Sequence, residues 1–122
     1  MVDTEKLTDA FSAFKRAAKK EFGATVWARQ NFWCCQTCAS ADFSVKRDKK
    51  KNPNNIIGTV YYTQQSAASM RKGDDLWVSY GAFSGGDEIT VKIGKIFCEI
   101  AKEKGLSVEW DENPREKIRI IA

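Results

Sequence analysis

Residues 26–38 read VWARQNFWCCQTC, and this stretch decides the fold. Its first part, residues 26–33, is rich in the β-branched and aromatic residues that suit a pleated surface, and it predicts a buried strand. In a strand, alternate side chains share a face, so one face would carry Val26, Ala28, Gln30 and Phe32 and the other Trp27, Arg29, Asn31 and Trp33. Because both faces hold large apolar groups, we predict a central strand that is covered on both sides.

After Trp33 the alternation stops and a helical spacing begins. Cys34 and Cys38 are four residues apart, and Cys35 and Cys38 are three apart, so all three thiols can crowd one face of the first helical turns. The free amides and the dipole at a helix N-terminus favour a thiolate and lower the pKa of a cysteine. We call Cys34, Cys35 and Cys38 the cysteine corner, and we expect any functional site to lie there.

The rest of the chain predicts elements on either side of this junction. The first is a helix from Asp3 or Thr4 to Phe22, which ends at Gly23. The cysteine-bearing helix ends within residues 46–51, and a turn follows at residues 52–55. Then come a strand at 56–63, a loop or short helix at 64–72, a strand at 76–83, a helix at 88–104 and a hairpin of strands at 106–110 and 117–122. This α-β-α-β-β-α-β-β order predicts a single α+β domain with three helices and a mostly antiparallel sheet of about five strands.

Composition limits the possible functions. The chain has 122 residues, enough for one domain with its own core, and no apolar run approaches the roughly 20 residues of a membrane span. Residues 1–7 are polar and acidic, unlike a secretory signal, and four unevenly placed cysteines do not resemble a disulfide framework. We therefore expect a cytoplasmic protein. There is no histidine, which excludes histidine-based catalysis and histidine metal ligands.

The cysteines allow three interpretations. Free cysteines often pack as small hydrophobic residues, and this is the interpretation that we favour, for Cys98 as well. A dithiol redox site is suggested by the C-x-x-C spacing of Cys35 and Cys38, although the hairpin-rich element order does not match a thioredoxin-like fold. A zinc site is the third, with the corner completed by Cys98 or a carboxylate. Apart from zinc, no cofactor is predicted.

The sequence favours non-catalytic binding, since no catalytic constellation is recognisable. We predict a pocket in which Arg29, the cysteine corner, Gln65 and Tyr80 converge, with an unknown protein or a small anionic ligand as partner. Nucleic acid is an alternative partner for the basic segment formed by Lys46, Arg47, Lys49, Lys50 and Lys51. The aromatic side chains could line a groove, but we favour a core role for Trp27, Trp33, Tyr61, Trp77 and Phe83.

Four segments resemble an uncharacterised, mainly bacterial family classed as a domain of unknown function. They are the A-R-x-x-F-x-C-C-x-x-C segment at 28–38, a Y-H-x-Q-D segment at 62–66, an L-x-x-x-Y-G strand at 76–81 and a G-L-x-V-x-W-D hairpin at 105–111 followed by Arg119-Ile120. The resemblance covers residues 24–121. In place of the family's histidine and aspartate this chain has Thr63 and Ser66, so chemistry carried by those two residues would be lost here.

Overall fold

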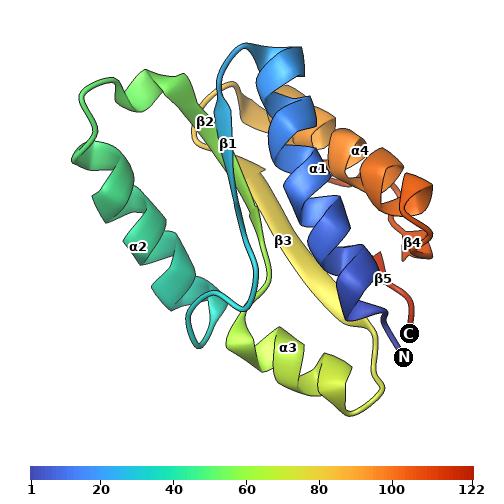
Figure 1. Ribbon diagram of the computed structural model, residues 1–122. Coiled ribbons are helices and arrows are strands. Elements are labelled where there is room, and N and C mark those ends of the chain that lie inside the picture. Colours follow the sequence, from blue (N-terminus) through green and yellow to red (C-terminus); the bar gives the residue numbers. More distant parts are fainter.

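The computed structural model describes residues 1–122, and Figure 1 shows a twisted sheet with helices on both of its faces. The elements are α1 (Thr4–Phe22), β1 (Thr25–Arg29), α2 (Gln36–Asp48), a 3-10 turn η1 (Pro53–Asn55), β2 (Ile56–Tyr61), α3 (Gln64–Arg71), β3 (Leu76–Ala82), α4 (Gly86–Glu103), β4 (Val108–Glu109) and β5 (Ile118–Ile120). The strand order is β1-β2-β3-β5-β4. Only β1 and β2 are parallel.

The main core lies between the sheet and the two long helices α1 and α4, which pack side by side on one face (Figure 1). α1 begins because the Asp3 carboxylate accepts hydrogen bonds from the amides of Glu5 and Lys6, and it ends at Gly23, whose φ of 63° suits a glycine. Inside this core the rings of Phe11 and Phe14 both meet Phe97 edge to face. Burial of this apolar layer is the main source of stability.

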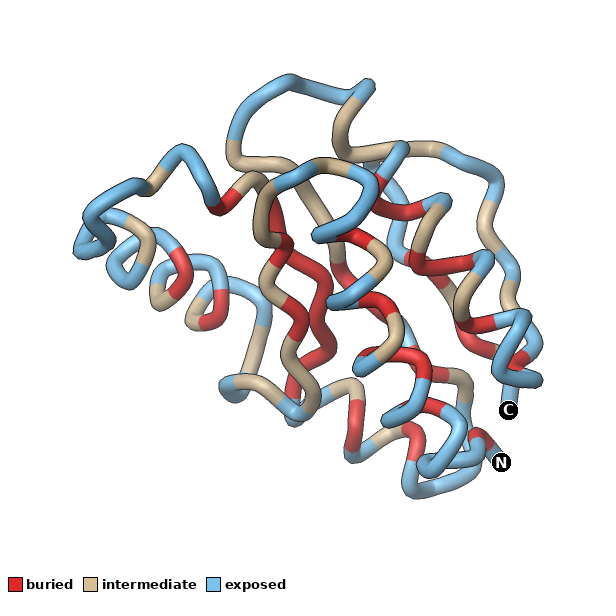
Figure 2. The backbone as a smooth tube through the Cα atoms, turned by 45° about the horizontal axis from the view of Figure 1, so that its top comes forward, coloured by how far each residue is buried: buried red, intermediate tan, exposed pale blue.

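The opposite face carries α2 alone. Only two of its residues, Ala39 and Phe43, are buried, and they form a small separate cluster with Tyr61 of β2. Figure 2 shows α2 as a mostly exposed coil at the left of the molecule. This side of the fold is therefore held by a few aromatic contacts rather than by a continuous core.

The α+β class, the single mostly antiparallel sheet and its five strands are confirmed. The count of three helices was too low, because residues 64–71 form the helix α3. The central position predicted for the first strand is wrong: β1 is an edge strand that pairs only with β2. It is nevertheless covered on both faces, by α1 and by the aromatic cluster under α2, which explains its apolar sequence.

β1 also ends earlier than predicted, at Arg29. Asn31 and Trp33 then adopt positive φ values of 52° and 58°, so the chain turns and the alternation of faces is lost. Phe32 was assigned to the face of Val26, but its ring stacks on Phe43 at 4.8 Å, on the α2 side of the sheet. No helix is both long enough and apolar enough to cross a lipid bilayer.

Candidate functional site

The cysteine corner sits where the loop after β1 enters α2. Cys34 precedes the helix, Cys35 is its N-cap residue and Cys38 lies in the first turn. The three Sγ atoms all lie within 4.8 Å of one another, and the Sγ atoms of Cys34 and Cys35 are 3.8 Å apart. Cys34 is exposed and the other two are half-buried, so the group is open to solvent. The predicted convergence of these thiols is confirmed.

The thiols of Cys35 and Cys38 are electrostatically unequal. The pKa of Cys35 is lowered, first by a hydrogen bond from the backbone amide of Cys38 and then by its contacts with the Cys38 and Cys34 thiols. The pKa of Cys38 is raised to about 11, because its thiol hydrogen-bonds to Cys34 and Cys35 and would ionise beside their negative charge. The Cys35 thiol therefore ionises more readily than the Cys38 thiol.

Backbone hydrogen bonds fix the loop that carries the corner. The amide of Phe32 donates to the carbonyl of Tyr62 at 2.9 Å, and the amide of Gln64 donates to the carbonyl of Trp33 at 2.8 Å. The amide of Gln65 donates to the carbonyl of Cys34 at 3.3 Å. The loop is thus tied to the junction of β2 and α3, which fixes the position of the segment that carries Cys34 and Cys35.

The other residues of the predicted pocket do not converge on the corner. The five best-formed hollows of the surface have volumes of about 190–460 Å³, and no corner cysteine lines any of these five. Arg29, Gln65 and Tyr80 line three different ones. Only Gln65 touches the corner, through its backbone. These hollows therefore do not bring Arg29, Gln65 and Tyr80 together, and ligand binding by these residues stays a prediction.

Tyr80 has a structural role on the opposite side of the sheet. Its ring meets Trp110 edge to face, and its hydroxyl accepts a hydrogen bond from Trp110 Nε1 at 2.8 Å. The same hydroxyl lies 2.8 and 2.7 Å from the carbonyl oxygens of Asn113 and Glu116, to which it donates. These bonds hold the hairpin between β4 and β5.

The full chain, residues 1–122, matches the sequence profile of DUF6891, a domain of unknown function. The chain belongs to this family. The resemblance seen in the sequence is confirmed, and the match also takes in α1 at the start of the chain. No curated protein and no solved structure matches the sequence.

In this DUF6891 domain, Thr63 and Ser66 form the N-terminal cap of α3. Thr63 is the N-cap of α3, and its hydroxyl accepts a hydrogen bond from the amide of Ser66 at 3.3 Å. Ser66 Oγ lies 3.4 Å from the Thr63 hydroxyl. The two positions at which the family resemblance places a histidine and an aspartate therefore form a helix cap here.

The basic segment of the DUF6891 domain is only partly free. Lys46 forms an ion pair of 3.0 Å with Asp42, and Arg47 donates from Nε to the carbonyl of Ile56 at 3.0 Å. The Arg47 guanidinium also lies 4.6 Å from the ring centre of Phe83. These two cations stabilise α2, while Lys49, Lys50 and Lys51 are exposed. Nucleic-acid binding by the segment stays a prediction.

Cys98 and Asp42 are the remaining residues of interest in the domain. Cys98 is buried on α4 within the main core, so it packs as predicted and is not in the corner, and its burial raises its pKa to about 12. Asp42 was not predicted as a site residue, and its carboxylate has a lowered pKa because Lys46 hydrogen-bonds to it. Its place four residues after Cys38, on the same side of the helix, was a signal in the sequence.

Proposed function

We propose that this domain binds a thiophilic metal ion, Zn²⁺ or Cu⁺, through Cys34, Cys35 and Cys38. The observation that carries the proposal is the approach of three Sγ atoms to within 4.8 Å of one another on an exposed loop. Thiolates select zinc and monovalent copper over hard cations such as Mg²⁺ and Ca²⁺, which take oxygen ligands. A three-thiolate set without histidine belongs to this class.

The distances support a shared ion. Zinc–sulfur bonds of about 2.3 Å place the sulfurs of a tetrahedral site about 3.8 Å apart. The Sγ atoms of Cys34 and Cys35 already lie at 3.8 Å. The widest pair, at up to 4.8 Å, must close by about 1 Å, which a side-chain rotation supplies.

The charge of the site supports the same conclusion. Three thiolates around Zn²⁺ carry one net negative charge, and they sit at the N-terminus of α2, where the helix dipole stabilises negative charge. Binding requires that Cys38, with its pKa of about 11, give up its proton. Metal affinity is therefore expected to fall as the pH falls.

A metal would also add an attachment for α2. The helix has one small buried cluster, and an ion shared by the loop cysteines and Cys38 would join its first turn to the segment tied to α3. A ligand that binds only the folded form stabilises it by mass action. The role we propose is thus a metal-binding site that also orders α2.

The test is a metal titration of reduced protein, with Zn²⁺ and Cu⁺ as separate arms. We expect one ion per chain, release of protons on binding, and at least a tenfold loss of affinity in each of Cys34→Ser, Cys35→Ser and Cys38→Ser. Cys98→Ala is the matched control, because it removes a thiol that lies outside the corner. Retained binding in the variant lacking all three corner cysteines would refute the proposal, as would no binding by the reduced protein.

The unequal pKa values favour one second candidate, dithiol exchange with a disulfide substrate. The Cys35 thiolate would attack one sulfur of that disulfide and expel the other as a thiolate, which leaves a mixed disulfide. Cys38 would then lose its proton and attack Cys35, releasing the second thiol and closing a Cys35–Cys38 disulfide. Two electrons pass to the substrate. Stoichiometric reduction of a small disulfide such as oxidised glutathione by the reduced protein, lost in Cys35→Ser, would support this candidate, and no reduction would exclude it.

A further inference from the structure

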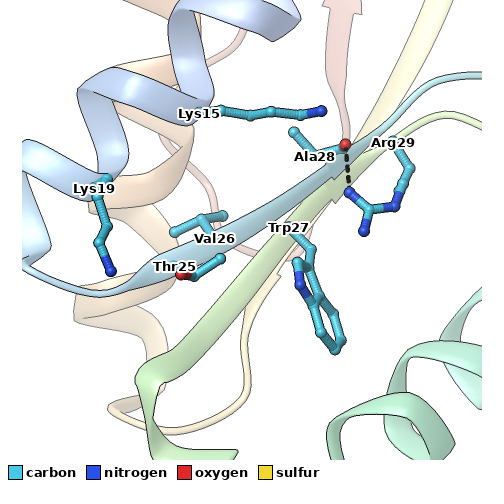
Figure 3. Close-up of a pocket in the computed structure, with 7 residues that line it drawn as sticks. All are labelled: Lys15, Lys19, Thr25, Val26, Trp27, Ala28 and Arg29. Carbon is cyan, nitrogen blue, oxygen red and sulfur yellow. Dashed lines mark hydrogen bonds between the residues drawn. The ribbon is translucent and has the colours of Figure 1, made fainter. Parts of the chain in front are cut away.

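The face of the sheet that carries α2 is filled on the β1 side and hollowed on the β3 side. Figure 3 shows the Trp27 ring pointing away from Lys15 and Lys19, toward the α2 side of β1. There its ring centre lies 5.9 Å from that of Phe43 and 6.3 Å from that of Phe83. Beyond this aromatic packing, a groove of about 190 Å³ lies between α2 and β3.

The floor of the groove is made of small and hydroxylated residues. Thr59 of β2 lies directly opposite Gly81 of β3, and the next pair on this face is Tyr61 with Ser79. Residues directly opposite on neighbouring strands share a face, so all four lie on the α2 side of the sheet. The ring of Phe43 covers Tyr61 at 5.2 Å. The other three residues have short side chains or none, and they line the groove.

Two buried hydroxyls of this floor have no hydrogen-bond partner in the protein. Thr59 is 8% exposed and Ser79 is 6% exposed. Neither oxygen is fully enclosed, and both residues line the groove. Buried hydroxyls in folded proteins almost always have a partner. A polar ligand at the bottom of the groove would supply the two that are missing.

Gly81 keeps the floor of the groove open. Its φ is not positive, so its backbone conformation does not require glycine. A Cβ atom at this position would meet nothing within 4 Å, so packing does not require glycine either. Glycine inside a strand weakens the strand, and it often marks a site that a ligand approaches closely.

The α2 side of the groove adds polar groups but no charge. Gln36, Ser40 and Ser44 follow at four-residue spacing, so they form one stripe of the helix. The groove also contacts the ring-bearing residue Phe83, and none of its lining residues is charged. An ion placed there would lose hydration without gaining an ion pair. The volume also lies below the roughly 300–1,000 Å³ of pockets for drug-sized ligands.

We propose that the groove between α2 and β3 binds an uncharged cyclic polyol of monosaccharide size. The hydroxyls of such a molecule both donate and accept, as do those of Thr59 and Ser79, and the Gln36 amide offers both functions as well. Its C–H groups pack on aromatic carbon such as that of Phe83. The groove thus matches a ligand that is polar at its edge and apolar on its faces.

The experiment titrates glucose, galactose and myo-inositol separately into the reduced chain and follows the amide signals by NMR. We expect at least one of the three to shift the signals of Thr59, Ser79 and Gly81, and we expect weaker binding of glucuronate and glucosamine. No shift with any of the three, or equal binding of the charged analogues, would overturn the proposal. The methyl glycoside of a sugar that binds distinguishes two supporting outcomes: retained binding assigns the groove to a glycan end, and lost binding to the free sugar.

Gly81→Ala tests the open floor. The added methyl group takes up space in the groove, and overpacking of this kind is expected to weaken binding by about 5- to 150-fold. The unfolding midpoint is expected to stay the same or rise, because the methyl group meets no protein atom. Unchanged affinity would show that the ligand does not reach the floor, and a lower midpoint would show that the floor is not open. Either result would overturn the proposal.

Two hydroxyl variants test the polar contacts. Thr59→Val and Ser79→Ala are each expected to weaken binding by about 2- to 12-fold, the value of one hydrogen bond. Both are expected to keep the fold, because no partner in the protein is lost. Ser12→Ala is the matched control, since it removes an exposed hydroxyl from α1 on the other face of the sheet. No loss in the two groove variants, or an equal loss in the control, would overturn the proposal.

Discussion

Replacing Phe43 by alanine is expected to detach α2 while the rest of the domain stays folded. Phe43 is the centre of the small cluster: its ring centre lies 4.8 Å from that of Phe32, 5.2 Å from Tyr61 and 5.9 Å from Trp27. The main core of 21 buried residues contains none of these four. Losing the ring therefore weakens one face of the sheet and leaves the other packed.

The magnitude follows from the burial of Phe43, which is 3% exposed. Truncating a buried phenylalanine to alanine costs about 3–5 kcal/mol. Since about 1.4 kcal/mol corresponds to a factor of ten, the opening of α2 would become about two to three and a half orders of magnitude more favourable. Global stability falls by less, because local opening of α2 limits the cost to the free energy that attaches the helix.

Amide hydrogen exchange measures this directly. We expect faster exchange across Gln36–Asp48 in Phe43→Ala and unchanged protection in α1 and α4. The matched control is Phe14→Ala, which removes a fully buried ring from the main core and is expected to lower the protection of every element together. If Phe43→Ala lowers the free energy of global unfolding as much as Phe14→Ala, the division into two independent clusters is refuted.

Three further predictions concern other groups. Tyr80→Phe is expected to lower the free energy of unfolding in urea by about 1–3 kcal/mol, because the hydrogen-bond partners in the hairpin lose the hydroxyl; an unchanged midpoint would contradict this role. The pKa of Asp75 is lowered by a hydrogen bond from the amide of Ala122 and by Arg119, so its contribution to stability is present above the usual carboxyl pKa and is lost as the pH falls through the folded value. In acid titrations below about pH 4 the wild type should lose stability more steeply than Asp75→Asn, and parallel curves would exclude the contribution. Cys35 is expected to react with iodoacetamide at lower pH than Cys38, whose pKa is about 11, as read from tandem mass spectra; the reverse order would disprove the assignment of the thiolate.

The sequence predicted those features that depend on local spacing. The helix that ends at Phe22 and the approach of Cys35 to Cys38 both follow from helical periodicity, and both were found. Residues 64–72 predict either a loop or a short helix, because α3 has only eight residues and a weak pattern. Its existence depends on the Thr63 cap and on burial of Ala67 and Met70.

Features that depend on distant parts of the chain were not predictable. An apolar strand has the same sequence whether its second neighbour is a strand or water, so the edge position of β1 could not be distinguished from a central one. The position of the Phe32 ring depends on the positive φ values of Asn31 and Trp33. The alternation of residue types in this segment does not indicate them. The position of Tyr80 on the α4 side was not predictable either, because strand alternation alone does not tell which face meets which helix.

α2 is attached to the rest of the domain by side chains at its C-terminal end and in its middle, but its N-terminal end lacks a side-chain cap. At the C-terminal end Arg47 donates to the carbonyl of Ile56 and packs on Phe83, and in the middle Phe43 fills the small cluster. At the N-terminal end the loop is fixed to α3, yet the Cys35 side chain makes no capping hydrogen bond. An uncapped helix start beside three thiols is the point at which an added ligand gains most, because it supplies an attachment that the chain does not make for itself. Ligand binding at the cysteine corner would therefore change the order of α2 more than that of any other element.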